Sequence, residues 1–325
     1  MGDLAQPERV RPPALRPGDT VGIIAPAGVI HPDALEAGCA WLERKKLRPF
    51  HLPSILDRNL YFAGSRKRRL DEFHEMFTRP EVKAIICARG GYGCNYLLPE
   101  IDLDLVRANR KIFCGSSDVT TLLTFLCDRA GMVTLHGPML NTDVRPDGVD
   151  DASWNAGFFS GEAYRREFRQ LEVQTLVPGS AQGMLYGGCL SLLCASIGTP
   201  YEIETNGTIL FIEDLAEPAF RIDRMLMQLK YAGKFEGVRG IVFGEMLKCG
   251  PRDSGEYTLT QVIERVVGNL GIPIAYGLKS GHVSGGNITI PFGVQAQFSA
   301  APDTVSLAWD ASVQREPSPA TNRTS

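Results

Sequence analysis

A serine placed between a buried strand and a helix is the residue of this sequence best suited to act as a nucleophile. Ser117 follows the apolar run 111–115 and precedes an expected helix over residues 118–126. A tight turn at such a place exposes a side chain near the positive end of the helix dipole, as in a nucleophile elbow, although the segment is not Gly-x-Ser-x-Gly. Alternatively, Ser116 and Ser117 only cap the helix. The pattern alone leaves both interpretations open.

A glycine-rich loop follows another expected strand. The apolar run 82–88 ends in Arg89-Gly90-Gly91-Tyr92-Gly93. A loop of this kind can bring bare backbone N–H groups toward an oxyanion or a phosphate. On its own the signal is weak, because most glycine-rich turns are only turns.

Activation of a serine requires a base, and histidine suits neutral pH. His74 falls within an expected amphipathic helix and is interpreted as a structural, partly exposed residue. His136 ends an expected strand and could line the same crevice as Ser117. His282 lies in the small-residue loop 279–287, which suits a site better than a core. The residues alone do not rank His136 against His282. The remaining histidines lie near turns beside prolines: His31 and His51.

A carboxylate that orients the imidazole would complete the set. Glu213 and Asp214 directly follow the expected strand 208–212. They could serve this purpose, or they could be a solvated loop pair or a helix cap.

The elements that must position these residues indicate an α/β protein. Short apolar runs alternate with amphipathic stretches in the first half, which predicts crossover units and a mostly parallel sheet covered on both faces. Ligands of such sheets bind beyond the carboxyl ends of the strands. The expected strands are 20–26, 82–88, 111–115 and 132–135, and the expected helices are 34–45 with Asp33 as cap, one after Ser65, and 118–126.

The length of 325 residues favours two domains. We predict an N-terminal nucleophile domain, a linker, a C-terminal domain that carries the glutamate and the second histidine, and a disordered tail. Their expected limits are 1–145, 146–182, 183–310 and 311–325. The C-terminal domain should contain helices at 190–197, 221–231 and 259–270, the last capped by Thr258, and strands at 208–212, 238–243, 287–290, 294–298 and 304–309.

Composition argues against several classes of function. The net charge is −3 and basic residues are scattered. The one basic run, 66–69, reads as a solvated helix face, so we expect no nucleic-acid binding. No apolar stretch reaches the length of a membrane span, and the N-terminus lacks a signal region, so we expect no membrane association and a cytoplasmic location. Eight cysteines without close pairs predict buried thiols, neither metal nor cofactor, and an inert Cys114.

In their order along the chain, these segments resemble the LD-carboxypeptidase family of serine peptidases, which includes muropeptide LD-carboxypeptidases and microcin C self-immunity hydrolases. The resemblance spans about residues 15–294. It rests on short segments: 16–19 with 25–27, 61–64, 89–93, 115–118, 136–138, 211–214 with 221–224, and 281–282. The resemblance implies a flavodoxin-like N-terminal domain with a mostly parallel sheet, a smaller C-terminal α/β domain containing β structure, and a homodimer.

The resemblance also implies a site. Its triad would be Ser117, Glu213 and His282, with His136 lining the crevice and Ser116 dispensable. The oxyanion would be bound by backbone N–H groups of Gly91 and Asp118. The expected substrate-binding residues are Arg89, Gly90, Tyr92 and His136. Many relatives have Asn where this chain has Cys189, which leaves substrate detail open.

The implied activity is hydrolysis of an L,D-peptide bond that releases terminal D-Ala from muropeptide tetrapeptides in peptidoglycan recycling. An alternative within the same family is an amidase that inactivates a microcin C-like peptidyl-nucleotide. Alternatives from another class are a non-enzymatic binding protein and a flavodoxin-like cofactor binder, although the chain has no dinucleotide fingerprint.

Overall fold

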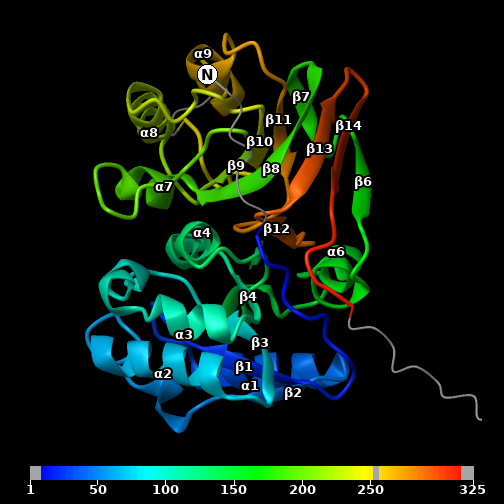
Figure 1. Cartoon of the computed structure of the whole chain (residues 1–325). Helices are drawn as coiled ribbons and strands as arrows, with labels where there is room; N and C mark the ends of the chain where they lie inside the picture. Colours follow the sequence, from blue (N-terminus) through cyan, green and yellow to red (C-terminus); the bar gives the residue numbers. More distant parts are fainter. Residues whose placement is uncertain (1–8, 252–255, 316–325) are drawn as a thin grey trace, which may run out of the picture.

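The computed structural model describes residues 9–251 and 256–315 and contains two β-sheets, seen in the lower and upper halves of Figure 1. The first sheet has the order β12-β5-β4-β3-β1-β2, and its strands are parallel except β12, which pairs antiparallel with β5. The order 2-1-3-4-5 is that of flavodoxin-like folds, so the predicted fold class is confirmed. The strands are β1 (Thr20–Ile24), β2 (Arg48–Phe50), β3 (Val82–Cys87), β4 (Ile112–Gly115), β5 (Thr134–His136) and β12 (Ile290–Phe292).

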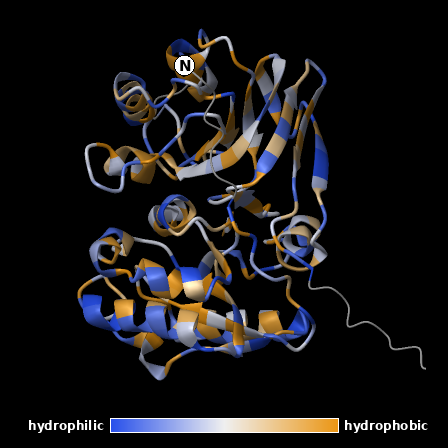
Figure 2. Cartoon of the chain, viewed as in Figure 1, coloured by the Kyte–Doolittle hydropathy of each residue, from blue (hydrophilic) through white to orange (hydrophobic). Residues whose placement is uncertain are grey.

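Helices cover both faces of this sheet because its strands are apolar on both sides. In β3, Ile85 packs in the cluster that contains Phe73 of α2, whereas its neighbour Ile86 packs with Leu35 and Leu42 of α1. Figure 2 shows apolar residues along the strands and mixed polar and apolar residues along the helices. The helices of this half are α1 (Pro32–Arg44), α2 (Arg66–Thr78), α3 (Leu103–Ala108), α4 (Thr120–Arg129), α5 (Leu140–Asp143) and α6 (Asp151–Asn155) with a π-turn at Ala156–Ser160.

The helix starts show which capping predictions hold. The helix expected after Ser65 is α2, and Ser65 is its N-cap, where its side chain accepts a hydrogen bond from the Arg68 N–H at 3.1 Å. The prediction of Asp33 as the cap of α1 is wrong, because the helix begins at Pro32 with His31 as N-cap. A proline is favoured at the first helical position, which leaves Asp33 in the first turn, where its charge meets the helix dipole.

The second sheet has the order β6-β14-β13-β8-β9-β10-β11-β7. Its strands β8 to β11 are parallel, and antiparallel strands flank them on both sides. Thr258 caps α9 in a capping box, as predicted. The strands are β6 (Tyr164–Arg169), β7 (Gln174–Val177), β8 (Gly179–Cys189), β9 (Thr208–Glu213), β10 (Gly240–Gly244), β11 (Ile274–Leu278), β13 (Gln295–Ala300) and β14 (Thr304–Trp309); the helices are α7 (Leu190–Ser196), α8 (Ala219–Tyr231) and α9 (Leu259–Val267).

The segment 146–182, which we expect to be a linker, contains regular structure. Strand β6 pairs with β14 and β7 pairs with β11, so both belong to the second sheet. Strand β6 is an edge strand, and its charged residues are typical of edges, although they hide the strand signal in the sequence. Residues 311–315, part of the expected disordered tail, pack on the first half, where Val313 is buried. The rest of that tail, 316–325, lies outside the described residues.

The basic run 66–69 is only partly a solvated face, contrary to our expectation. Arg69 is 2% exposed, and its Nη1 donates to the carbonyls of Pro26 (2.7 Å) and Gly93 (2.8 Å). Arg68 pairs with the buried Glu72 at 2.6 Å. These side chains hold the loops after β1 and β3 in place, because each donor satisfies a backbone carbonyl or carboxylate that has little access to water.

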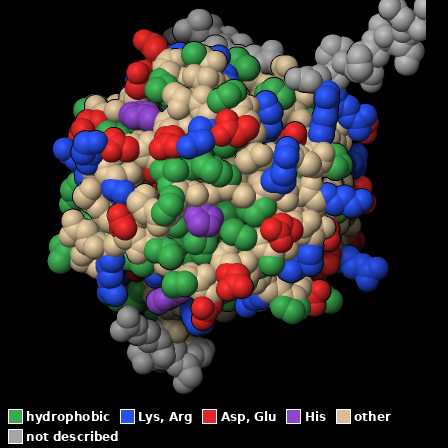
Figure 3. Space-filling model, turned by 90° about the horizontal axis from the view of Figure 1, so that it is seen from below, with side chains coloured by type: hydrophobic (Ala, Val, Ile, Leu, Met, Phe, Trp, Pro, Cys, Tyr) green, Lys and Arg blue, Asp and Glu red, His purple; other side chains and the backbone are tan. Residues whose placement is uncertain are grey.

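One face of the molecule carries side chains of both charges. On the face shown in Figure 3, Lys and Arg lie among Asp and Glu without a continuous patch of one sign. Among residues 9–251 and 256–315, no helix is long and apolar enough to cross a bilayer, and no three His, Cys, Asp or Glu side chains gather as a metal site would require.

We predict that Arg69→Met lowers the free energy of unfolding by about 2–4 kcal/mol, because two buried carbonyls lose a charged donor. Urea denaturation would measure the change. Arg66→Met on the same helix is the control: Arg66 is exposed and pairs with Glu100, so its loss should cost at most about 0.5 kcal/mol. Equal stability of the two variants would contradict this role of Arg69.

Candidate active site

Ser117 lies on a strained turn at the carboxyl end of β4. Its φ is +60°, a left-handed conformation that costs a non-glycine residue about 1–3 kcal/mol. The 3₁₀ turn Ser117–Val119 leads directly into α4, and the Ser117 side chain is partly exposed. A Cβ on Gly115 would lie 2.7 Å from Val119, so the turn is closed against the strand end. This is the geometry of a nucleophile elbow, in agreement with the predicted position of Ser117.

The glycine-rich loop after β3 touches this turn. A Cβ on Gly90 would lie 2.8 Å from Ser117 Cβ, 2.9 Å from its Oγ and 3.4 Å from the Asp118 backbone nitrogen. Gly90 must therefore be glycine for the loop to approach the serine this closely. Gly91 is exposed with a φ of +111°, and the Gly28 N–H donates to the Gly90 carbonyl at 2.9 Å. The loop is thus held against both the turn and the strand end of β1.

The other predicted residues of this region have distinct positions. The Asp118 carboxylate is buried and accepts the Cys94 N–H at 2.9 Å, which ties the glycine-rich loop to the turn; burial raises the pKa of Asp118. Arg89 is half-buried, and its Nη1 donates to the Val29 carbonyl at 2.6 Å. Tyr92 is 42% exposed. Asp118 therefore shapes the loop through its side chain.

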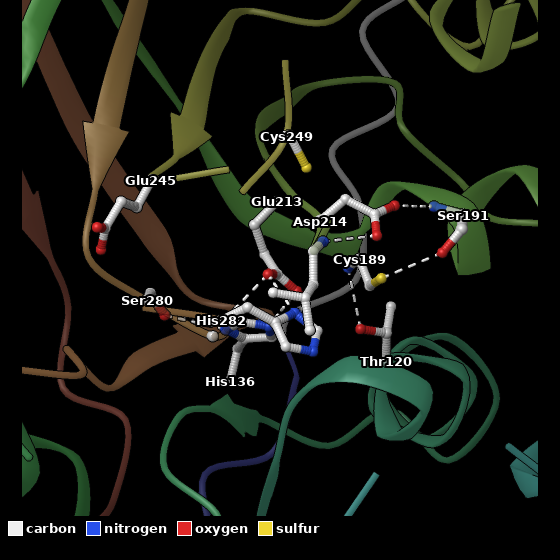
Figure 4. A network of polar contacts seen from close by, with 12 residues as sticks. Thr120, His136, Cys189, Ser191, Glu213, Asp214, Glu245, Cys249, Ser280 and His282 are labelled. Carbon is white, nitrogen blue, oxygen red and sulfur yellow. Dashed lines mark hydrogen bonds and ion pairs between the residues drawn. The ribbon is translucent and has the colours of Figure 1, made fainter. Parts of the chain in front are cut away.

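Glu213 and His282 form a hydrogen-bonded pair in which Glu213 is fully buried and the His282 side chain is 19% exposed. Nδ1 of His282 lies 2.8 Å from Glu213 Oε2, and the backbone N–H of His282 donates to the same oxygen at 3.1 Å (Figure 4). Glu213 is fully buried, which opposes its ionisation, but His282 and His136 outweigh burial and lower its pKa. Burial also opposes the charged form of His282 and so lowers the pKa of its imidazole. Glu213 outweighs burial and raises this pKa above its usual value of 6.5. The pair fixes the imidazole and leaves its Nε2 available.

His136 lies behind this pair and not at an open surface. Its side chain is 0% exposed, whereas the sequence led us to expect it in the crevice wall. Its Nδ1 lies 2.9 Å from Ser280 Oγ, and its Nε2 lies 3.8 Å from Glu213 Oε1. His136 and His282 therefore face the two oxygens of one carboxylate, as Figure 4 shows. The two histidines that the sequence could not rank thus lie next to the same carboxylate, that of Glu213.

Contacts between the two halves join the turn to the glutamate strand. The Cys189 N–H, at the end of β8, donates to Thr120 Oγ1 at 3.0 Å, and a Cβ on Gly188 would lie 2.4 Å from Thr120 Cγ2. Cys189 is the register partner of Glu213. Its thiol is buried, and burial raises its pKa well above 9.0. Cys189 thus contributes its backbone to this junction.

Sequence reasoning missed Thr120 and Ser280 as parts of this region. Thr120 lies one residue after the turn that contains Ser117, and Ser280 lies two residues before His282, so proximity in sequence was the only available signal. Both are buried and bond to groups from distant segments.

The described structure has no hydrogen bond between the side chains of Ser117 and His282. Such bonds are often long in a free enzyme and shorten when substrate binds.

Two family models match this chain: the N-terminal domain of LD-carboxypeptidases over residues 21–137 and the C-terminal domain over residues 182–298. The probable murein peptide carboxypeptidase of Bacillus subtilis is 42% identical over 299 residues, which cover 90% of this chain and 93% of that protein. The protein belongs to the LD-carboxypeptidase family.

Two further relatives agree with this assignment. The muramoyltetrapeptide carboxypeptidase of Oxalobacter formigenes superimposes with a TM-score of 0.82 at 27% identity, over 91% of this chain and all of that chain. The microcin C7 self-immunity protein MccF of Escherichia coli is 28% identical over 315 residues, with 86% of this chain and 90% of that protein covered. The predicted LD-carboxypeptidase family is confirmed.

We predict that kcat/KM of this LD-carboxypeptidase family member for peptide hydrolysis falls as the pH drops through a pKa above 6.5. A general base must be neutral, and Glu213 stabilises the protonated form of His282. Glu213→Gln should lower kcat/KM about 10²- to 10⁴-fold and move the acidic limb to lower pH. Glu245→Gln is the control, since that carboxylate accepts the Ser284 N–H in the same loop without contacting His282. An unmoved limb in Glu213→Gln would count against the pairing.

We predict that Gly281→Ala lowers kcat/KM by about 10²-fold, the effect of a displacement near 1 Å. Its Cβ would lie 2.7 Å from both Glu213 Cδ and His136 Cε1. Gly286→Ala is a matched control in the same loop: both glycines have positive φ, but a Cβ on Gly286 meets nothing within 4 Å. Steady-state kinetics of the two variants would separate displacement of Glu213 from backbone strain. Equal losses would show that strain alone is responsible.

Proposed function

We propose that the protein is a serine carboxypeptidase that hydrolyses the L,D-peptide bond of muropeptide tetrapeptides, releasing terminal D-Ala in peptidoglycan recycling. The observation that carries the proposal is the Glu213–His282 hydrogen bond of 2.8 Å, and the strained turn that holds Ser117 is consistent with it. A buried carboxylate on Nδ1 holds the imidazole in the tautomer that a base requires. The arrangement of serine, histidine and carboxylate supports acyl transfer.

The proposed reaction has two stages. Nε2 of His282 accepts the Ser117 hydroxyl proton as Oγ attacks the carbonyl carbon, and the resulting oxyanion binds the backbone N–H groups of Gly91 and Asp118. His282 then donates the proton to the amine of D-Ala, which leaves as an acyl-enzyme forms. A water molecule, deprotonated by His282, attacks the ester; the bond to Ser117 Oγ breaks, His282 returns the proton to Oγ, and the shortened peptide is released. Each oxyanion donor contributes about 3–4 kcal/mol to such a reaction.

The names of the relatives support a muropeptide substrate. The 42% identical relative is named a probable murein peptide carboxypeptidase, and a 30% identical protein of Pseudomonas aeruginosa is named a murein tetrapeptide carboxypeptidase. The alternative substrate, a microcin C-like peptidyl-nucleotide, has the support of the more distant MccF.

Arg89, Gly90 and Tyr92 lie on the loop next to Ser117 and are the proposed substrate contacts. A homodimer and a cytoplasmic location also belong to this proposal.

The test is incubation of the purified protein with a muropeptide tetrapeptide and, separately, with a peptidyl-adenylate mimic. We expect D-Ala release, detected by mass spectrometry, and a loss of at least about 10³-fold in kcat/KM for Ser117→Ala. Ser116→Ala is the matched control, because its neighbouring hydroxyl should be dispensable. Undiminished D-Ala release by Ser117→Ala would refute the nucleophile. Preferential cleavage of the adenylate mimic would favour the alternative substrate.

A further inference from the structure

Two buried polar atoms face each other where the two sheets meet. Oε1 of Glu213 and Nε2 of His136 are 3.8 Å apart, and neither has a hydrogen-bond partner among the described residues. Both side chains are 0% exposed. An unsatisfied buried acceptor costs about 1–3 kcal/mol, more when it is charged. An approach of about 0.8 Å would convert this contact into an ordinary hydrogen bond.

The chemistry of the two groups selects one tautomer of His136. An ionised carboxylate only accepts hydrogen bonds, so Nε2 must carry the proton when it faces Oε1. Nδ1 is then an acceptor, and Ser280 Oγ, 2.9 Å away, is the donor that it needs. The opposite tautomer would direct a lone pair at a buried carboxylate. Ser280 therefore sets the proton position of His136 from the far side of the ring.

Packing leaves the imidazole little freedom to choose another partner. The ring of Phe211 lies 5.2 Å and that of Phe292 5.5 Å from its centroid. A Cβ on Gly281 would lie 2.7 Å from His136 Cε1, so the loop backbone closes the third side. With its plane fixed in this way, the imidazole presents Nε2 to Glu213.

The backbone of His136 belongs to the sheet that carries Ser117. His136 ends β5, its register partner in β4 is Gly115, and the Gly137 N–H donates to the Gly115 carbonyl at 3.0 Å. Glu213 ends β9 of the other sheet. The contact between His136 and Glu213 thus joins the two sheets, and in the first sheet His136 is paired with Gly115, two residues before Ser117 in the sequence.

We propose that His136 is a positioning residue: oriented by Ser280, it donates from Nε2 to Oε1 of Glu213 and thereby fixes the Glu213–His282 pair relative to the Ser117 sheet. The inference rests on the proposed function, since it assigns His136 a place behind the triad and not in contact with substrate. Glu213 then receives one donor from each histidine, one on each oxygen.

The first test needs no substrate. In the unsubstituted protein labelled with ¹⁵N-histidine, the ring resonances at neutral pH report which nitrogen carries the proton, and His136→Gln assigns them by their loss. We expect His136 as the Nε2–H tautomer. An Nδ1–H tautomer or an imidazolium would overturn the proposal. Because activity is not measured, this result stands even if Ser117→Ala were to refute the proposed function.

The second test compares two side chains of similar size. Gln at position 136 can place an N–H near the position of Nε2, whereas Met fills the same volume without a donor. We expect His136→Met to lower kcat by about 10- to 100-fold with little change in KM, and His136→Gln to recover most of that loss. Thermal unfolding of both proteins reports their stability separately. Equal kcat values for the two variants would overturn the proposal.

The third test removes only the orienting hydroxyl. Ser280→Ala, a small change that keeps the ring, should lower kcat about 10-fold in the natural background and have almost no effect beside His136→Met. Additive losses would show that Ser280 acts independently of His136 and would overturn their coupling. If the His136 variants do not fold, Ser280→Ala alone still tests the inference, because an unchanged kcat in this single variant would overturn the orienting role of Ser280.

Discussion

The buried carboxylate of Glu213 is the constraint on which the arrangement of this site depends. A carboxylate without access to water is costly to ionise, and donors from different elements must surround it. Here the donors are the side chain and backbone N–H of His282, on the loop after β11, and His136 faces the remaining oxygen from β5. The ends of β9 and β5 and one loop must therefore meet at a single point. This requirement places the carboxyl end of the first sheet against that of the second.

Glycines at three contacts allow this convergence. Gly90 lies against Ser117, Gly188 against Thr120 and Gly281 against Glu213, and at each position a Cβ would approach a neighbouring heavy atom within 2.8 Å. The glycine-rich segments of the sequence thus mark places where the backbone of one segment touches side chains of another. At Gly90 the close approach to Ser117 itself excludes a side chain, so the lack of a Cβ matters more there than the backbone freedom of glycine.

Local patterns in the sequence predict the first sheet and the position of Ser117 well, because a buried strand followed by a small polar residue is a short-range feature. The features that those patterns miss depend on contacts between segments that are distant in the sequence. Strand β6 carries charges because it is an edge strand, so its sequence resembles a linker. Arg69 is buried because carbonyls from two distant loops converge on it. Likewise, the residues alone could not rank His136 against His282, since both face Glu213 and only the fold distinguishes the partly exposed ring of His282 from the enclosed ring of His136.

The path of the chain explains how a site divided between two sheets keeps its geometry. The loop that carries His282 leaves β11 of the second sheet and enters β12, which pairs with β5 of the first sheet, where Ile290 is the register partner of His136. The loop is therefore attached to both sheets at its two ends. Any rotation of one sheet against the other would strain this loop, as well as the bond between Cys189 and Thr120. The same short segment thus supplies an imidazole and restricts the motion that would displace it from Ser117.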